Sequence, residues 1–362
     1  MNLSREMGKA HSHTTRYGPL HPALNPVARL ASCLYVWGVN SRNRRFDADA
    51  TRAHRLPLPV VSIGNITAGG TGKTPFTSWL ADVLTTAGRN PVIAMRGYKA
   101  RHGKESDEQS EHRRRLPNID VVANPDRHAA LLKYLKSNSE CDCVLLDDGF
   151  QHRQLAREID LVLVDATAPL PDQDRLLPAG WLREPAENLT RADAVILTRA
   201  DLKDEARLDR LRKTITRLHG KPPLAEFCHA WSHLTLDMET QQPTTWLAQK
   251  RLVVTCGIGN PKSVIDMAGQ CGAVIVATHV LKDHAPFTSA DVNRIKELSI
   301  GADAVLTTEK DWSKLEPLLR QQPLDVPIVR PFLEMTPLAG TEPLTQAVIQ
   351  ACTPNGIEHN DR

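Results

Sequence analysis

The sequence predicts an α/β protein with a doubly wound parallel sheet and a second, smaller α/β lobe. The first observation is a series of short apolar runs that are continuous rather than alternating, as in parallel strands covered by helices on both faces. The second is a glycine-rich segment between the first such run and an amphipathic helix. The third is the length of 362 residues, which exceeds the usual size of one domain.

The N-terminal region contains one apolar segment. Residues 1–20 are polar and rich in histidine, so we expect them to be disordered. Residues 21–45 include the apolar run Val27–Val39, which is too short to span a bilayer and is followed by three arginines. One interpretation is an amphipathic helix in a membrane interface, with Tyr35 and Trp37 at the depth of the headgroups. The other is a first helix packed on the domain.

Residues 46–220 are predicted to form the first lobe. After its first strand, apolar residues recur on one face of a helix at 76, 79, 80, 83 and 84, and Gly88 is a natural stop. The predicted strands of this lobe are Val60–Ile63, Pro91–Met95, Cys143–Leu146, Leu161–Val164 and Ala194–Leu197.

The alternation of strands and helices ends near residue 220. Residues 221–250 combine prolines with polar residues and are predicted to be a linker. Residues 251–350 resume the pattern as the smaller C-terminal lobe, and residues 351–362 are predicted to be a frayed tail. The predicted strands of this second lobe are Leu252–Thr255, Val274–Ala277, Ala304–Thr307 and Val326–Arg330.

Charge and cysteine content exclude some classes of function. The 45 basic and 42 acidic residues give a formal charge of +3, whereas a general nucleic-acid binder normally carries a strongly basic face. We therefore expect no nucleic-acid partner. The seven cysteines are scattered without the paired spacing of zinc sites, which indicates reduced thiols in a cytosolic protein.

The glycine-rich segment GNITAGGTGKTP predicts a phosphate-binding P-loop, and hence an NTPase-like fold for the first lobe. Backbone N–H groups of such a loop converge on phosphate oxygens, and the following helix adds its positive end. Lys73 is expected to reach the β- and γ-phosphates, and the Thr74 hydroxyl to contact Mg²⁺. The predicted ATP-binding residues are Thr67, Ala68, Gly69, Gly70, Thr71, Gly72, Lys73 and Thr74.

Two adjacent carboxylates, Asp147 and Asp148, end the predicted strand Cys143–Leu146. A carboxylate at this end of a parallel strand lies beside the phosphate loop and can hold Mg²⁺. Adjacent side chains point in different directions on a strand, so both could face a metal only if the chain turns. The alternative is a simple turn of Asp-Asp-Gly type.

Four other features are ambiguous when taken alone. Asp107 and Glu108 lie in the irregular stretch Arg101–Arg115, from which a loop could deliver a general base, although loop acids are usually only solvated. His284 is a lone histidine of the second lobe. The run Arg113–Arg115 is interpreted as a solvated helix face, and Asp201 only loosely resembles the base-reading corner of GTPases.

Several motifs, in order, resemble those of the tetraacyldisaccharide 4′-kinases, and the likeness runs from about residue 20 to residue 335. The most specific are DDGFQH together with RLLPAGWLREP. Ser106 stands where the family usually has Gly or Asn. The motifs are GNITAGGTGKTP, RGY (Arg96–Tyr98), SDE (Ser106–Glu108), NPDR (Asn124–Arg127), DDGFQH, RLLPAGWLREP (Arg175–Pro185), GIGNPKS (Gly257–Ser263), KDHAPF (Lys282–Phe287) and TEKDWSKL (Thr308–Leu315).

This resemblance implies a specific reaction and location. ATP and Mg²⁺ are the implied cofactors, and the acceptor is the 4′-hydroxyl of a tetraacylated glucosamine disaccharide 1-phosphate, a lipid A precursor. The resemblance also implies peripheral or monotopic attachment to the cytoplasmic face of the bacterial inner membrane, with no obligate protein partner. It further implies a catalytic pair of Asp107 and His284, assisted by Lys73, and metal ligands among Thr74, Asp147 and Asp148.

Two other classes of function are compatible with a phosphate loop. A P-loop ATPase or GTPase that acts as a switch would hydrolyse nucleotide without phosphorylating a lipid. A catalytically inactive membrane-binding protein would show no turnover, but the intact Lys73, Thr74, Asp147 and Asp148 argue against it.

Overall fold

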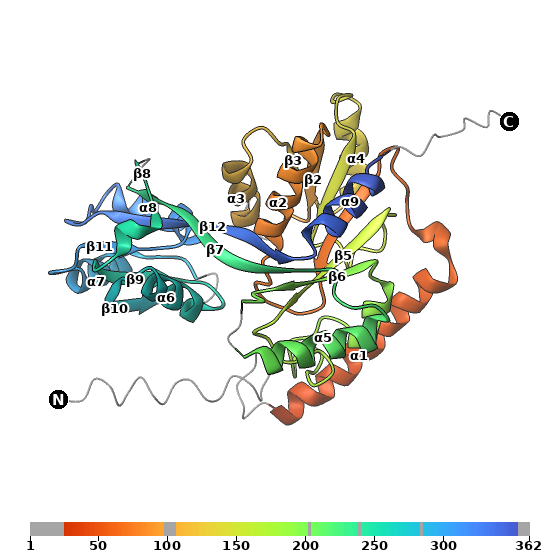
Figure 1. Cartoon of the computed structure of the whole chain (residues 1–362), viewed down its shortest axis with the longest axis horizontal. Helices are drawn as coiled ribbons and strands as arrows, with labels where there is room; N and C mark the ends of the chain where they lie inside the picture. Colours follow the sequence, from red (N-terminus) through yellow and green to blue (C-terminus); the bar gives the residue numbers. More distant parts are fainter. Residues whose placement is uncertain (1–24, 98–105, 202–203, 238–239, 283–284, 354–362) are drawn as a thin grey trace.

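The computed structural model describes residues 25–97, 106–201, 204–237, 240–282 and 285–353 (Figure 1). Its helices are α1 (Asn25–Ala48), η2 (Ala50–Arg52), α2 (Lys73–Thr86), α3 (Asp107–Arg115), α4 (Arg127–Leu135), η3 (Ala186–Arg191), α5 (Glu205–His219), η4 (Thr244–Leu247), α6 (Pro261–Gln270), α7 (Ser289–Leu298), α8 (Glu309–Leu319) and α9 (Thr341–Ala351). Its strands are β1 (Val60–Asn65), β2 (Pro91–Met95), β3 (Val121–Ala123), β4 (Cys143–Asp147), β5 (Ile159–Asp165), β6 (Ala194–Thr198), β7 (Ala225–Leu236), β8 (Thr240–Gln242), β9 (Arg251–Cys256), β10 (Val274–Val280), β11 (Ala304–Leu306) and β12 (Ile328–Ala339).

The described strands form one continuous 12-stranded sheet in the order β10-β9-β11-β12-β7-β6-β5-β1-β4-β2-β3, with β8 paired to β7. Pairing is parallel from β3 to β7 and from β10 to β12 along this order. The two exceptions are the pair of β7 and β12 and the pair of β7 and β8, which are antiparallel. Figure 1 shows these two long strands running between the lobes. The doubly wound α/β fold with a second, smaller lobe is therefore confirmed.

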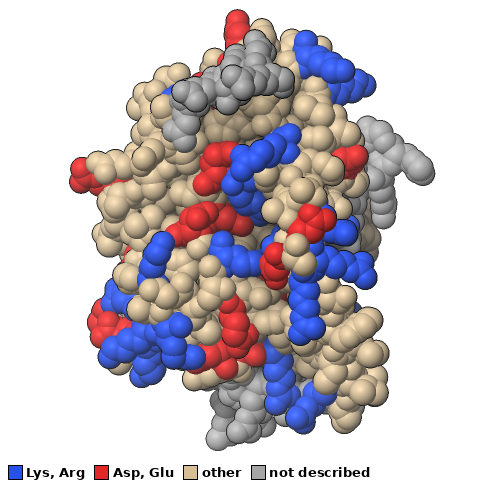
Figure 2. Space-filling model, turned by 90° about the vertical axis from the view of Figure 1, so that its right-hand side faces the viewer, with Lys and Arg blue, Asp and Glu red and all other residues tan. Residues whose placement is uncertain are grey.

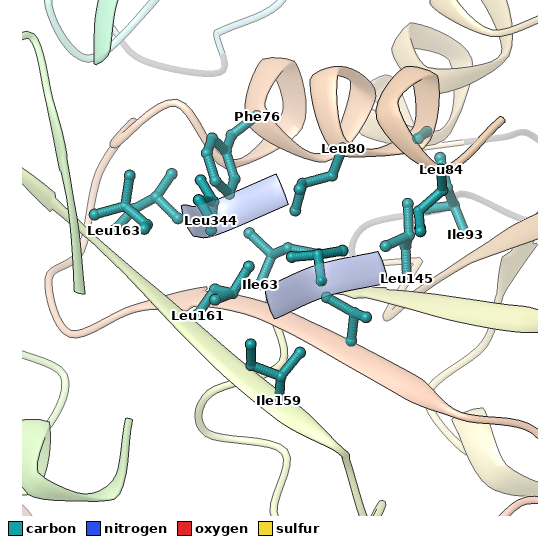
Figure 3. Packing of buried hydrophobic residues seen from close by; sticks show 14 of the residues in the cluster. Ile63, Phe76, Leu80, Leu84, Ile93, Leu145, Ile159, Leu161, Leu163 and Leu344 are labelled. Atoms are coloured by element: carbon teal, nitrogen blue, oxygen red, sulfur yellow. The ribbon is translucent and has the colours of Figure 1, made fainter. Parts of the chain in front are cut away.

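The core of the first lobe lies between α2 and the sheet. Phe76, Leu80 and Leu84 of α2 are fully buried and point toward sheet residues such as Ile63 and Leu145, as Figure 3 shows. Strands β1, β2 and β4 are buried along their whole length, which explains their continuous apolar sequences. Every predicted strand is confirmed, with differences of up to three residues at the ends except for β12, which continues nine residues beyond the predicted end at Arg330.

The expected linker 221–250 is not an irregular tether. It contains the 12-residue strand β7, the short β8 and the turn η4. The sequence pattern concealed β7 because the strand is only partly covered, so polar residues such as His229 and Ser232 interrupt its apolar residues. This segment joins the lobes by strand pairing with β12.

The expected irregular stretch Arg101–Arg115 ends in helix α3, which begins at Asp107. Ser106 caps this helix, because its Oγ accepts a hydrogen bond from the Gln109 N–H at 3.2 Å. The interpretation of its C-terminal arginines as a purely solvated face is wrong for Arg115. The Arg115 guanidinium donates to the Leu333 carbonyl at 2.5 Å and stacks on the Phe332 ring.

Helix α1 extends to Ala48, three residues beyond the predicted bound, and runs along the outside of the first lobe (Figure 1). Among the described residues, no helix is long and apolar enough to cross a membrane. On the face shown in Figure 2, basic and acidic side chains are interspersed rather than gathered into one basic field. The predicted disordered N-terminus 1–20 lies outside the described residues, as does most of the predicted tail.

Candidate active site

The phosphate loop lies between β1 and α2 and is fixed by the ends of two strands. The Asn65 amide donates to Thr71 Oγ1 at 2.9 Å, and the Thr198 hydroxyl donates to the Thr71 carbonyl at 3.0 Å. Gly72 precedes α2 in a left-handed conformation, with φ of 87°. A Cβ atom at Gly72 would meet His229 Nε2 at 2.4 Å, so both backbone and space require glycine.

Two further contacts tie the loop to distant segments. The Ala68 N–H donates to the Trp181 carbonyl at 2.6 Å, and Arg199 donates to the Gly70 carbonyl at 3.0 Å. Trp181 belongs to the RLLPAGWLREP motif, and Arg199 follows β6. The loop is therefore held from both sides before any nucleotide binds.

Asp148 faces the phosphate loop. Its backbone is left-handed, with φ of 53°, so the chain does turn after Asp147. Its carboxylate lies 3.4 Å from Lys73 Nζ and accepts bonds of 2.7 and 3.0 Å from Arg183. Burial acts to raise the pKa of Asp148, but Lys73 and Arg183 outweigh it and lower that pKa to about 2.

Asp147 is held at both carboxylate oxygens. Oδ2 lies 2.9 Å from Nε2 of His112, and Oδ1 accepts the Asp148 N–H at 2.8 Å. The Asp147 side chain is only 5% exposed and that of His112 is fully buried. The two adjacent aspartates therefore have different environments. Asp147 is buried and hydrogen-bonded at both oxygens, whereas Asp148 is partly exposed and lies beside the phosphate loop.

Glu108, the second residue of α3, is a third carboxylate close enough to Asp147 and Asp148 to be affected by their charges. Glu108 is exposed as a whole residue, but partial desolvation of its carboxyl raises its pKa, and the negative charges of Asp147 and Asp148 raise that pKa further, whereas Lys73 and Lys310 lower it. Lys310 is on α8 of the second lobe, so Glu108 lies within electrostatic reach of both lobes. The sequence indicated only a loop acid here, because the start of α3 was not recognised.

Glu184, next to Arg183 in the same motif, is fully buried and accepts four hydrogen bonds. Its donors are Asn43 of α1 at 3.2 Å, Gln151 at 2.8 Å, Asn188 at 2.8 Å and Arg191 at 2.7 Å. Gln151 also donates to the Asn65 carbonyl at 2.8 Å, directly before the phosphate loop. This network connects α1 to the loop.

The predicted site residues stand as follows. Lys73, Asp147 and Asp148 come together at the carboxyl ends of β1 and β4, and Thr74 follows Lys73 in α2. Asp107 is the first residue of α3, directly before Glu108. His284 lies outside the described residues.

Sequence reasoning assigned no role to Arg183, Glu184 or His112. The first two lie in RLLPAGWLREP, whose specificity was recognised, so that motif was the available signal. His112 carried no signal of its own, because its partner is 35 residues away.

A lysine-bearing glycine loop facing acidic residues at the end of a neighbouring parallel strand is the arrangement of P-loop nucleotide-binding proteins. This chain has that fold and that arrangement.

Comparison with known proteins specifies the family. The profile described as Tetraacyldisaccharide-1-P 4′-kinase matches residues 24–351. The tetraacyldisaccharide 4′-kinase of Chlorobaculum parvum is 34% identical over 310 residues, which cover 80% of this chain and 84% of the relative. That of Geobacter sulfurreducens is 32% identical over 333 residues, covering 87% and 90%.

A solved structure agrees with these relatives. The Aquifex aeolicus LpxK crystal structure, described as an "apo" form in complex with ATP, superposes with a TM-score of 0.68 at 27% identity. The match covers 91% of this chain and all of that one. The chain therefore belongs to the tetraacyldisaccharide 4′-kinase family. Members of this family are ATP-dependent kinases of lipid A biosynthesis.

Proposed function

We propose that ATP binds with its phosphates over the loop Thr67–Thr74, and that its terminal phosphoryl group passes to the 4′-hydroxyl of a tetraacylated glucosamine disaccharide 1-phosphate. The observation that carries this proposal is the contact of Lys73 with Asp148 directly beside the loop. Lys73 offsets charge on the transferring group, as the loop lysine does in P-loop enzymes generally. The ATP complex of the Aquifex aeolicus relative supports the nucleotide assignment.

The carboxylates of Asp147, Asp148 and Glu108, here called the acidic corner, have the donor chemistry for Mg²⁺. Mg²⁺ prefers carboxylate and hydroxyl oxygens and is usually held by one or two carboxylates together with substrate phosphates. Thr74, Asp147 and Asp148 supply such oxygens. Glu108 adds a carboxyl whose pKa is raised first by desolvation and then by the negative charges of Asp147 and Asp148, which a cation would offset. In the ranges that the structure describes, no cluster of three or more acidic, His or Cys side chains could hold a metal ion. When bound, Mg²⁺ neutralises charge on the phosphates.

Asp107 is the proposed base for the acceptor hydroxyl, with His284 as the residue that orients it or raises its basicity. The support is the position of Asp107 at the start of α3, one residue before Glu108, whose carboxyl senses both the loop lysine and the second lobe. His284 follows Lys282 in that second lobe.

Glu108 is a competing candidate for the base. Its raised pKa lies nearer to the working pH than that of an ordinary carboxyl, which favours proton acceptance and return. Asp107→Asn and Glu108→Gln variants separate the two assignments in a transfer assay with labelled ATP and the lipid acceptor. If Asp107 is the base, Asp107→Asn loses transfer by about 10²–10⁴-fold while retaining ATP binding. Wild-type transfer by Asp107→Asn would reject it as the base, and such a loss in Glu108→Gln alone would identify Glu108.

Helix α1 is the proposed seat on the cytoplasmic face of the inner membrane. Leu30, Leu34 and Trp37 form a stripe along the helix and are 70%, 70% and 74% exposed. The opposite face is tied to the first lobe, where Ser32 donates to the Leu176 carbonyl and Tyr35 to the Arg183 carbonyl, both at 2.8 Å. This supports both earlier interpretations of the segment: one face packs on the domain and the other is free for lipid.

Vesicle flotation tests this seat without any need for turnover. The variant Leu30→Ser/Leu34→Ser is expected to lose most of its binding to anionic phospholipid vesicles. Val274→Ser, which changes an exposed apolar residue of the edge strand β10, is the matched control and should float as wild type does. Equal flotation of all three proteins would reject α1 as the seat. The proposal includes no obligate protein partner.

A further inference from the structure

Helix α3 is an unusual support for a catalytic group. Its sequence DEQSEHRRR has no apolar side chain, so it cannot be seated by an apolar stripe. His112 is its one fully buried residue among those whose side chains are described. Apart from Leu116, which ends the helix and is buried in the core of the first lobe, polar contacts define how this helix sits against the rest of the molecule.

On the side of the phosphate loop, that contact is the pair of His112 and Asp147. An ionised carboxylate only accepts hydrogen bonds, so the ring must donate from Nε2 to Asp147 Oδ2 across the 2.9 Å separation. Nδ1 of the same ring is buried without a hydrogen-bond partner in the described part of the chain. Burying Nδ1 without a hydrogen-bond partner costs folding stability. The His112 ring occupies this position, in contact with Asp147, in spite of that cost.

On the side of the second lobe, α3 is held by its last two arginines. Arg114 donates to the Glu309 carbonyl at 3.2 Å, and Arg115 donates to the Leu333 carbonyl at 2.5 Å. Asp107 and Glu108 lie at the opposite end of the same short helix, one turn before His112. A change at His112 therefore alters the orientation of the Asp147 carboxylate and the placement of the acidic end of α3 together.

We propose that His112 is a positioning residue of the kinase: its Nε2–H fixes the Asp147 carboxylate and sets α3, with its acidic first turn, against the phosphate loop. This inference rests on the proposed place of Asp147 beside Mg²⁺. His112 touches neither nucleotide nor acceptor in this scheme. It acts through Asp147, as outer-shell partners of metal-binding carboxylates do.

Three variants test the proposal. His112→Leu removes the donor and keeps an apolar side chain of moderate size. His112→Gln keeps an N–H that can reach Asp147. His219→Leu is the control, because His219 is also buried and contacts the Ala192 carbonyl through Nε2 at 2.9 Å, in a contact that involves none of the proposed site residues.

The main readout is equilibrium binding of ATP as a function of Mg²⁺ concentration, measured by calorimetry, with thermal melting to establish folding. We expect His112→Leu to bind ATP in EDTA within about twofold of wild type. Its half-saturating Mg²⁺ concentration should rise by about 10–100-fold, the usual effect of losing an outer-shell partner. His112→Gln should recover most of this loss, and His219→Leu should melt earlier with unchanged Mg²⁺ dependence.

Steady-state kinetics give an independent readout. In His112→Leu, kcat should fall at saturating ATP, lipid and Mg²⁺, because the acidic end of α3 is no longer held in place. A folded His112→Leu protein with wild-type Mg²⁺ dependence and kcat would overturn the proposal, as would equal Mg²⁺ shifts in His112→Leu and His219→Leu. Full transfer by Asp107→Asn would reject the proposed base but leave the Mg²⁺ result for His112 as a separate test.

Discussion

Glu184→Gln is the substitution that most directly tests the network behind the phosphate loop. The change keeps the shape of the side chain and removes its charge. If the new amide oxygen takes the place of Oε2, it still accepts from Asn43, Asn188 and Arg191. The new NH₂ group then faces the amide of Gln151, which is a donor, across the former 2.8 Å bond.

The expected cost follows from these contacts. Without the carboxylate charge the bond to Arg191 weakens, which costs about 1 kcal/mol, the difference between a hydrogen bond to a charged group and one to a neutral group. The Arg191 side chain is 20% exposed, so solvent partly compensates it. A buried donor facing another donor costs about 1–3 kcal/mol more. We therefore expect destabilisation by about 2–4 kcal/mol, the sum of the two costs.

Urea unfolding followed by tryptophan fluorescence measures this cost, because Trp181 lies three residues from the substitution. For a lobe of this size the melting temperature should fall by about 2–4 °C per kcal/mol. Glu187→Gln is the matched control, since Glu187 is exposed and should change stability by less than about 0.5 kcal/mol. A Glu184→Gln loss below about 1 kcal/mol would refute the reasoning, because it would mean that the four donors do not depend on the charge.

Three further outcomes are expected. Gly72→Ala should lose ATP binding by calorimetry, because its Cβ collides with His229 Nε2. The control Gly88→Ala has a similar positive φ but open space, so it should cost only about 1–2 kcal/mol of stability and bind ATP normally. Normal ATP binding by Gly72→Ala would contradict this reasoning. Glu108→Gln should stabilise the nucleotide-free protein at pH 7 by at most about 1 kcal/mol, given its exposure to solvent. The folded pKa of Glu108 lies above its unfolded value, so its carboxyl begins to cost stability as pH rises through the unfolded value of about 4, and the cost is complete above the folded pKa. The gain should therefore vanish below about pH 4 in denaturant titrations, and a gain that persists there would exclude a charge effect. Leu84→Ala should cost about 2–5 kcal/mol in urea unfolding, and a loss under 1 kcal/mol would mean that the α2 core readily collapses around the gap.

The sequence by itself determined nine of the 12 described strands, all but β3, β7 and β8, and it determined the position of the phosphate loop and of the adjacent pair Asp147 and Asp148. Continuous apolar runs such as Cys143–Leu146 predict strands because a strand buried on both faces needs apolar residues at every position. The glycines around Lys73 predict a phosphate loop because a loop that wraps phosphate needs backbone freedom at fixed spacing. The strand β7 was missed because partial exposure mixes polar residues into it.

Only the tertiary structure decided which polar groups meet across the sheet. Arg183 pairs with Asp148 over 35 positions, and His112 pairs with Asp147 over the same interval. Such contacts leave no periodic mark, because a hydrogen bond between distant segments constrains two side chains and nothing between them. The sequence could present Asp147 and Asp148 only as an adjacent pair. Their different surroundings follow from the left-handed turn at Asp148 and from the contacts of His112 with Asp147 and of Lys73 and Arg183 with Asp148.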